Sequence, residues 1–399
     1  MLIAISDHRS LTSDRKTPFV TLHLNCARSL ALPVVAAAIL GMSACSSNAR
    51  TGSPITTSAT SAASATSAAT ATAATAATAT TPATVAPTTA NTSPSTAGAD
   101  PLDIVVNSAV VPPATSIDAT LRTADGRERT YHVYVPAAVT NATTPVPLLV
   151  ALHGGTGWGK QFELNSGFDG LAEANGFVVV YPDGIGVGTD GTQLRTWNGG
   201  ACCGPAVKQQ VDDVGFIRQL IAVLESQYNI DRSRVFAAGH SNGGILAYRL
   251  ACELSDQIVA IGVQSSAMEV TGCAPDLPVS AIHIHGSADQ NVPIGGGIGP
   301  NAISGVAFNP PIDGATTLAA VDGCPAAPTV STSPANADLD ITTWSPCTDG
   351  SDVEFVEVAG ASHAWMGHTA GGSGKVGAPY ADLDSSLVIW NFLSQHARG

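Results

Sequence analysis

Residues 235–244 read Val-Phe-Ala-Ala-Gly-His-Ser-Asn-Gly-Gly. This stretch is the most informative part of the sequence for both the fold and the chemistry. A short apolar run leads into Gly-His-Ser-Asn-Gly, and a helical pattern of apolar residues begins at Asn242. A serine on such a strained turn tolerates only small residues two positions away, and Gly239 and Gly243 meet that need. The stretch therefore predicts Ser241 as a nucleophile, the alternative being a glycine-rich turn with an incidental serine.

The surrounding pattern predicts strands that alternate with helices. Apolar or alternating runs predict strands at residues 117–121, 130–135, 148–152, 177–181, 235–238, 258–263, 281–285 and 353–358. Helical patterns occupy 168–175, the segment that opens at Asp212 and Asp213, the segment after Ser241, and 386–396. We expect an α/β fold with a mainly parallel, doubly wound sheet of about eight strands flanked by helices. Residues 292–316 read as an inserted loop bordering a pocket.

A serine nucleophile needs a base and a carboxylate that orients the base. Asp289 and His363 each follow a predicted strand, and they come after Ser241 in the order Ser, Asp, His. The carboxyl ends of parallel strands share one edge of a sheet, so we expect the three side chains to meet there. The backbone N–H groups of Gly155 and Asn242 are the expected oxyanion donors.

Other candidates for these roles fit the pattern less well. His283 and His285 alternate with apolar residues inside a strand and are interpreted as structural, and His368 has no strand before it. Asp276 precedes its strand, and Asp313 and Asp322 fall in the insertion and the helix after it. Asp212 and Asp213 are interpreted as helix-capping residues rather than an acid/base pair.

Four residues are predicted to contact the substrate. Trp197 and Trp365 are expected to form an apolar wall, although each could equally be a core aromatic. His153 and His240 adjoin the predicted oxyanion turn and the nucleophile, so we expect them to border the substrate as well.

The first hundred residues are predicted to contain an export signal and a disordered stalk, and no folded domain. Residues 1–45 are predicted to be a signal peptide, because the apolar run 30–40 is too short to span a bilayer. Met42-Ser43-Ala44-Cys45 resembles a lipobox, which predicts lipidation of Cys45, with simple cleavage as the alternative. Residues 46–100 are rich in Ala, Thr, Ser and Pro and are predicted to be a disordered stalk. Residues 101–399 are the predicted catalytic domain.

The cysteine content indicates the redox compartment of the protein, and the net charge excludes some classes of binding partner. Apart from Cys26 and Cys45, six cysteines remain, and in an oxidising compartment we expect disulfides Cys252–Cys273 and Cys324–Cys347. Cys202 and Cys203 would form a vicinal pair or stay reduced. We expect no metal and no cofactor. A net charge of −14 without a run of basic residues argues against nucleic acid, and leaves a lipid anchor as the only expected membrane contact. The oligomeric state stays open.

Seven motifs occur in an order that resembles one enzyme family. They are Leu152-His153-Gly154-Gly155, Tyr181-Pro182-Asp183-Gly184, Trp197-Asn198 with Cys202-Cys203-Gly204, Val211-Asp212-Asp213-Val214-Gly215-Phe216, Gly239-His240-Ser241-Asn242-Gly243-Gly244, His285-Gly286-Ser287-Ala288-Asp289 and His363-Ala364-Trp365. The order resembles the polyhydroxybutyrate depolymerase-like esterases, a group that includes LpqC-like lipoproteins and is similar to bacterial feruloyl and acetylxylan esterases. The resemblance implies an α/β-hydrolase fold and a Ser-Asp-His triad at the same three residues.

The sequence therefore predicts an exported serine esterase that acts on small or polymeric esters of the hydroxyalkanoate, feruloyl or acetyl type. It would be a secreted or cell-surface lipoprotein. Two alternatives stay open: a non-catalytic cell-wall binding lipoprotein on the same fold, and an acyl-peptidase that uses the same triad on amides.

Overall fold

A ten-stranded sheet dominates the computed structural model, which describes residues 116–140, 142–368 and 375–399. The predicted signal peptide with its lipobox at Cys45, and the predicted stalk, lie outside these residues. In spatial order the strands are β1 (Ile117–Arg122), β2 (Glu128–Tyr134), β4 (Val178–Pro182), β3 (Val146–Leu152), β7 (Ile230–His240), β8 (Ala260–Gln264), β9 (Ser280–Gly286), β12 (Val353–Val358), β11 (Leu339–Trp344) and β10 (Thr329–Thr332).

The inner strands from β4 to β12 are parallel, and the pairs toward both edges are antiparallel. All eight predicted strands are present, with ends shifted by a few residues in most of them. Strands β10 and β11 were not predicted, because the exposed Thr-Val-Ser-Thr of β10 has the composition of a loop. A separate hairpin of β5 (Ile185–Val187) and β6 (Gln193–Thr196) was missed for the same reason.

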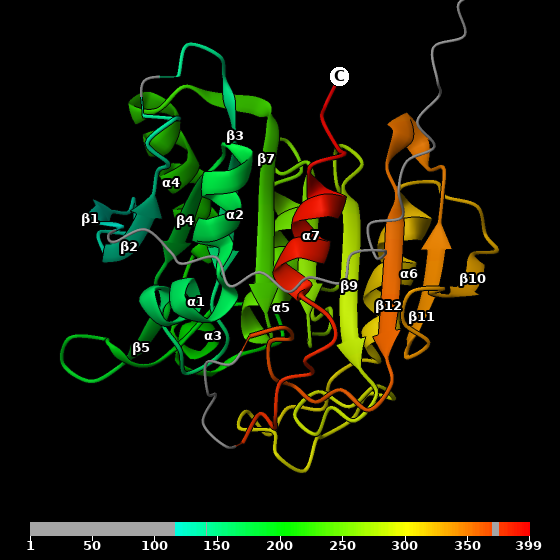
Figure 1. Ribbon diagram of the computed structural model, residues 1–399. Coiled ribbons are helices and arrows are strands. Elements are labelled where there is room, and N and C mark those ends of the chain that lie inside the picture. The colour runs from blue at the N-terminus through cyan, green and yellow to red at the C-terminus, as the bar shows by residue number, and fades with distance from the viewer. Residues whose placement is uncertain (1–115, 141, 369–374) are drawn as a thin grey trace, which may run out of the picture. The chain divides into compact units, whose positions relative to one another are not determined.

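Helices cover both faces of the sheet (Figure 1). One face carries α1 (Gly159–Ser166), α2 (Phe168–Asn175) and α7 (Ser385–Leu393), and the other carries α4 (Asp213–Gln227), α5 (Asn242–Glu253) and α6 (Pro311–Val321). Each face has its own apolar core, because β3 and β4 are buried on both sides. The short helices α3 (Gly204–Lys208) and η1 (Thr348–Gly350) lie in connections. This strand order with helices on both faces is the α/β-hydrolase fold.

Three disulfides join the six cysteines of the described domain. Cys252–Cys273 and Cys324–Cys347 have the predicted pairings, and Cys202 and Cys203 form the vicinal pair. The first pair connects α5 to the segment after β8, and the second connects the end of α6 to the segment after β11. The first bond therefore ties a helix to a loop, and the second joins two loops, because Cys324 lies after the end of α6.

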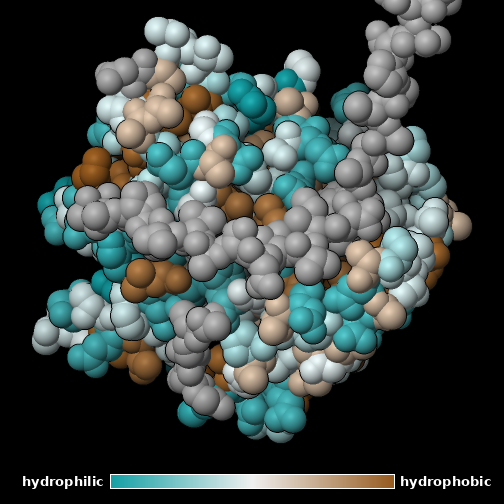
Figure 2. Space-filling view, in the orientation of Figure 1, coloured by the Kyte–Doolittle hydropathy of each residue, from teal (hydrophilic) through white to brown (hydrophobic). Residues whose placement is uncertain are grey.

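The surface shown in Figure 2 is mostly hydrophilic, with separate groups of hydrophobic residues. Within the described ranges, no helix has both the length and the apolar composition needed to cross a membrane.

Candidate active site

Ser241 lies at the sharp turn between β7 and α5. Its backbone has φ 53° and ψ −121°, a strained conformation for a residue with a side chain. A Cβ on Gly239 would collide with the backbone of Gly243, and a Cβ on Gly243 would collide with the Leu152 carbonyl. Both glycines are therefore required by close approach. The turn presents Ser241 at the N-terminus of α5, where the helix dipole favours negative charge.

The structure brings the three predicted catalytic side chains together. The Ser241 hydroxyl donates to Nε2 of His363 (2.9 Å), and Nδ1–H of His363 donates to Oδ2 of Asp289 (2.7 Å). Asp289 follows β9 and His363 follows β12, and these strands are neighbours in the parallel part of the sheet. The adjacent carboxyl ends explain why residues far apart in sequence meet.

Asp289 is held by more than its contact with His363. Its Oδ1 accepts from the backbone N–H groups of Asn291 (2.8 Å) and Val292 (2.9 Å). Burial opposes ionisation, but the hydrogen bond and charge interaction with His363 outweigh it, so the pKa of Asp289 lies below its ordinary value. The side chain is thus a fixed carboxylate with one oxygen reserved for His363.

The predicted oxyanion donors border the same cavity. Gly155 and Asn242 both line it beside Ser241. Within the described part of the chain, neither backbone N–H donates to a protein acceptor, so both can donate to a ligand. The Asn242 side chain instead brackets Trp197: its Oδ1 accepts from the Trp197 backbone N–H (2.7 Å), and its Nδ2 donates to the Trp197 carbonyl (3.0 Å).

His153 and His240 line the cavity and also have structural partners. His153 accepts from the Gly184 N–H at Nε2 (2.9 Å) and donates from Nδ1 to the Gly154 carbonyl (2.8 Å). His240 donates from Nε2 to the carbonyl of His363 (2.7 Å), which fixes the loop that carries His363. Burial lowers the pKa of His153 to about 4 and that of His240 to about 3. Both are neutral near pH 7, and their contact with substrate stays a prediction.

The cavity above Ser241 has a volume of about 590 Å³. Its apolar lining includes Phe162, Ile245 and Trp365, and three exposed hydrophobic residues, Trp158, Leu194 and Ile303, also border it. The segment predicted as an inserted loop, 292–316, borders it too, through Val292, Ala302, Ile303, Ser304 and Phe308, but residues 311–316 belong to helix α6 and not to a loop. Trp158 and Phe162 were missed, because α1 follows a glycine-rich turn without a strong helical pattern.

The prediction that Trp197 forms a cavity wall is wrong. Trp197 is fully buried, is not among the lining residues, and packs in the core beneath the site. Its indole N–H donates to the His153 carbonyl (2.9 Å), while its backbone is bracketed by Asn242. Trp197 therefore joins the two segments that carry the oxyanion donors. Trp365 does line the cavity, although it also packs edge-on against Phe162.

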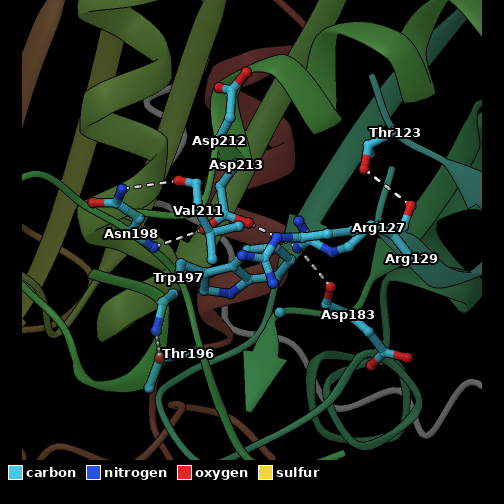
Figure 3. A network of polar contacts seen from close by, with 12 residues as sticks. Thr123, Arg127, Arg129, Asp183, Thr196, Trp197, Asn198, Val211, Asp212 and Asp213 are labelled. Carbon is cyan, nitrogen blue, oxygen red and sulfur yellow. Dashed lines mark hydrogen bonds and ion pairs between the residues drawn. The ribbon is translucent and has the colours of Figure 1, made fainter. Parts of the chain in front are cut away.

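A buried ion pair of Arg129 and Asp213 lies beside Trp197 (Figure 3), with Cζ of Arg129 5.7 Å from the centroid of the Trp197 ring. Arg129 donates from Nη2 to Oδ1 of Asp213 (2.7 Å) and to the Asp183 carbonyl (3.0 Å), and both paired side chains are almost inaccessible to solvent. The other Asp213 oxygen accepts from the Asn198 N–H (2.7 Å). The neighbouring Asp212 caps α4 by accepting from Gly215, as predicted. These contacts give the two aspartates structural roles.

The chain is similar to known esterases. Residues 123–316 match the family model described as "Putative esterase". The chain is 26% identical over 273 residues to the bifunctional acetylxylan esterase/xylanase of Neocallimastix patriciarum, covering 68% of this chain and 34% of that protein. It is 28% identical over 256 residues to feruloyl esterase B of Piromyces equi, covering 62% of this chain and 42% of that protein. The chain thus spans well under two thirds of the length of these relatives.

A solved structure of the acetyl xylan esterase from Aspergillus awamori superposes with a TM-score of 0.42 at 17% identity, covering 62% of this chain and 94% of that one. By its own strand order the described part of the chain has the α/β-hydrolase fold, and its sequence is similar to those of esterases.

Proposed function

We propose that the protein is an exported serine esterase that hydrolyses carboxylic esters through an acyl-enzyme. The observation that carries the proposal is the hydrogen-bonded line from Ser241 through His363 to Asp289, which opens onto a cavity. Similarity to esterases supports the reaction class.

The reaction would start with attack of Ser241 Oγ on the ester carbonyl while His363 Nε2 accepts the hydroxyl proton. The tetrahedral oxyanion would be held by the N–H groups of Gly155 and Asn242. His363 then protonates the leaving alcohol, and a water molecule activated by the same imidazole releases the acid. Asp289 keeps the imidazole in the tautomer that leaves Nε2 free to accept.

The cavity supports substrates that are not cationic. Among the lining residues that the structure describes, none is Asp or Glu, and Lys208 is the single Lys or Arg. This contrasts with a chain whose net charge is −14. Acetyl, feruloyl and hydroxyalkanoate esters are the candidates, the last through the resemblance to polyhydroxybutyrate depolymerase-like esterases.

Lys208 is expected to favour esters that carry a second, ionised carboxyl group. Lys208→Glu should raise KM for the mono-p-nitrophenyl ester of glutaric acid by about fivefold at low salt, with less effect at 0.5 M salt, because exposed charges are screened. The KM for p-nitrophenyl butyrate, which is neutral, should stay within about twofold. Steady-state kinetics on the two substrates measure the difference.

Arg232→Glu is the matched control, because it makes the same change of charge near the opposite end of β7 from Ser241. It should leave both KM values unchanged. Equal KM effects of Lys208→Glu on the two esters would remove Lys208 from substrate selection.

The proposed activity is tested with a panel of p-nitrophenyl acyl esters, methyl ferulate, acetylated xylan, soluble hydroxybutyrate oligomers and an acyl-peptide p-nitroanilide. We expect turnover of esters and much slower cleavage of the anilide. Faster cleavage of the anilide would favour an acyl-peptidase, and no turnover of any substrate would favour a binding protein.

We further propose that the protein is exported and held by a lipid on Cys45. Three disulfides in the described domain support an oxidising compartment. The wild-type protein should partition into a detergent phase, and Cys45→Ser should appear in the medium. Identical partitioning of the two forms would show simple secretion.

A further inference from the structure

A line of buried polar side chains runs from Asp289 into the core. The Tyr248 hydroxyl lies 2.9 Å from Nδ1 of His283, and Nε2 of His283 lies 3.1 Å from Nδ1 of His285. Nε2 of His285 lies 2.9 Å from the Val292 carbonyl and 3.5 Å from Oδ2 of Asp289. Tyr248, His283 and His285 are all completely buried.

The fold explains how these groups meet. His283 and His285 are two residues apart in β9, so they point to the same face of the sheet. Helix α5, which begins beside Ser241, covers that face and contributes Tyr248. The Tyr248 ring lies against Gly314 of α6, where a Cβ would come within 2.7 Å of it, so the far end of the line is closed by packing.

The donors in this line all point the same way. The Val292 carbonyl can only accept, so Nε2 of His285 carries a proton and its Nδ1 accepts. Nε2 of His283 must then donate, its Nδ1 must accept, and the Tyr248 hydroxyl is the terminal donor. Burial lowers the pKa of His285 to about 4 and that of His283 well below its ordinary value. Both rings are therefore neutral, and each has one N–H.

We propose that Tyr248, His283 and His285 are positioning residues that act on the triad through Asp289. The last donor of the line, Nε2–H of His285, donates to the Val292 carbonyl and lies 3.5 Å from Oδ2 of Asp289. The N–H of the same Val292 donates to Oδ1 of Asp289, so the line holds the residue that occupies Oδ1 and leaves Oδ2 to accept from His363. The inference rests on the proposed function, because it assigns these residues to the same triad. It differs from a purely structural role in coupling a buried tyrosine to the protonation behaviour of the base.

Few ionisable groups act on this part of the site. Asp289 faces His363 and His285, and His285 faces His283. His240 lies beside His363, with ring centroids 5.0 Å apart, and its low pKa keeps it neutral over the pH range in which esterases are assayed. Phe355 packs against His283 without adding charge. A change in the pH profile after substitution of His285 can therefore be attributed to a changed interaction between Asp289 and His363.

The test compares His285→Phe with His285→Gln. Phenylalanine keeps a planar ring but removes the N–H that holds the Val292 carbonyl and lies beside Oδ2 of Asp289. The Asp289 charge is then less stabilised by its surroundings and favours the protonated form of His363 more strongly. In the pH profile of kcat/KM, the acid limb (the rise on the acidic side) should shift to higher pH by about 0.5 to 1 unit. The value of kcat/KM at pH 6 should then be about fivefold lower than in the wild type. Glutamine, whose amide can donate near the Nε2 position, should restore the wild-type limb. Tyr248→Phe should give a smaller shift in the same direction.

Ile284→Val is the packing control, because Ile284 lies on the opposite face of β9 in the other core. It should lower Tm and leave the acid limb in place. NMR titration of the His363 ring in each variant gives the same comparison without any substrate, so failure of the proposed esterase activity would be recognised separately. If His285→Phe does not fold, Tyr248→Phe still decides, because it removes the terminal donor of the line. An unmoved acid limb and an unmoved His363 titration in the folded His285→Phe and Tyr248→Phe variants would overturn the proposal.

Discussion

Ser241→Ala is expected to lower kcat for ester hydrolysis by about 10⁵ to 10⁶-fold. The substitution removes the atom that we propose attacks the carbonyl, and without it His363 would have no hydroxyl to activate. The fold should persist, because the backbone hydrogen bond of residue 241 to the Gln264 carbonyl does not involve the side chain. Initial rates and thermal unfolding of the same preparation measure both quantities.

Ser266→Ala is a useful comparison for Ser241→Ala. The Ser266 hydroxyl donates to the Ser241 carbonyl (2.9 Å) and supports the turn without being placed to attack substrate. It should cost far less activity than Ser241→Ala. Turnover within tenfold of wild type in Ser241→Ala would exclude Ser241 as the nucleophile.

Asp289→Asn is expected to lower kcat by about 10⁴-fold. The backbone N–H groups of Asn291 and Val292 donate to one side-chain oxygen, so the asparagine carbonyl must occupy that position. Its NH₂ group would then face Nδ1 of His363 and force the proton onto Nε2. That tautomer cannot accept the Ser241 proton, although every heavy atom stays in place.

The comparison variant for this effect is Asp289→Ala, which removes the carboxylate without imposing a tautomer. Exogenous formate should partly restore activity to Asp289→Ala and not to Asp289→Asn. An Asp289→Asn variant with kcat close to wild type would show that another group orients His363.

The sequence was enough to predict that Ser241, Asp289 and His363 lie together, and to predict most of the sheet. Ser241 was identified because the elbow needs small residues at fixed spacing, a local requirement that the structure explains by backbone approach at Gly239 and Gly243. Asp289 and His363 were identified because parallel strands end at one edge. Strand β10 lies at the exposed edge, where burial imposes no apolar pattern, and the neighbouring β11 was missed although Leu339, Ile341 and Trp344 are buried.

The residues whose positions or roles were not predicted from the sequence are those whose surroundings depend on tertiary contacts. Trp197 lies in a long polar loop, and nothing local indicates that Asn242 and His153 hold it inside the core. His283 and His285 looked like ordinary residues of a buried strand. Only the position of Tyr248 on the covering helix and of Asp289 beyond the strand end shows that they form a directed line.

The most direct measurement of the central claim is covalent labelling with a fluorophosphonate, followed by intact-mass and peptide mass spectrometry. Such reagents form a stable adduct with an activated serine and stop turnover. We expect one adduct per chain, located on Ser241, absent in Ser241→Ala and much slower to form in Asp289→Asn. Complete loss of ester hydrolysis without labelling of Ser241, or labelling of a different serine that accounts for the loss, would contradict the assignment.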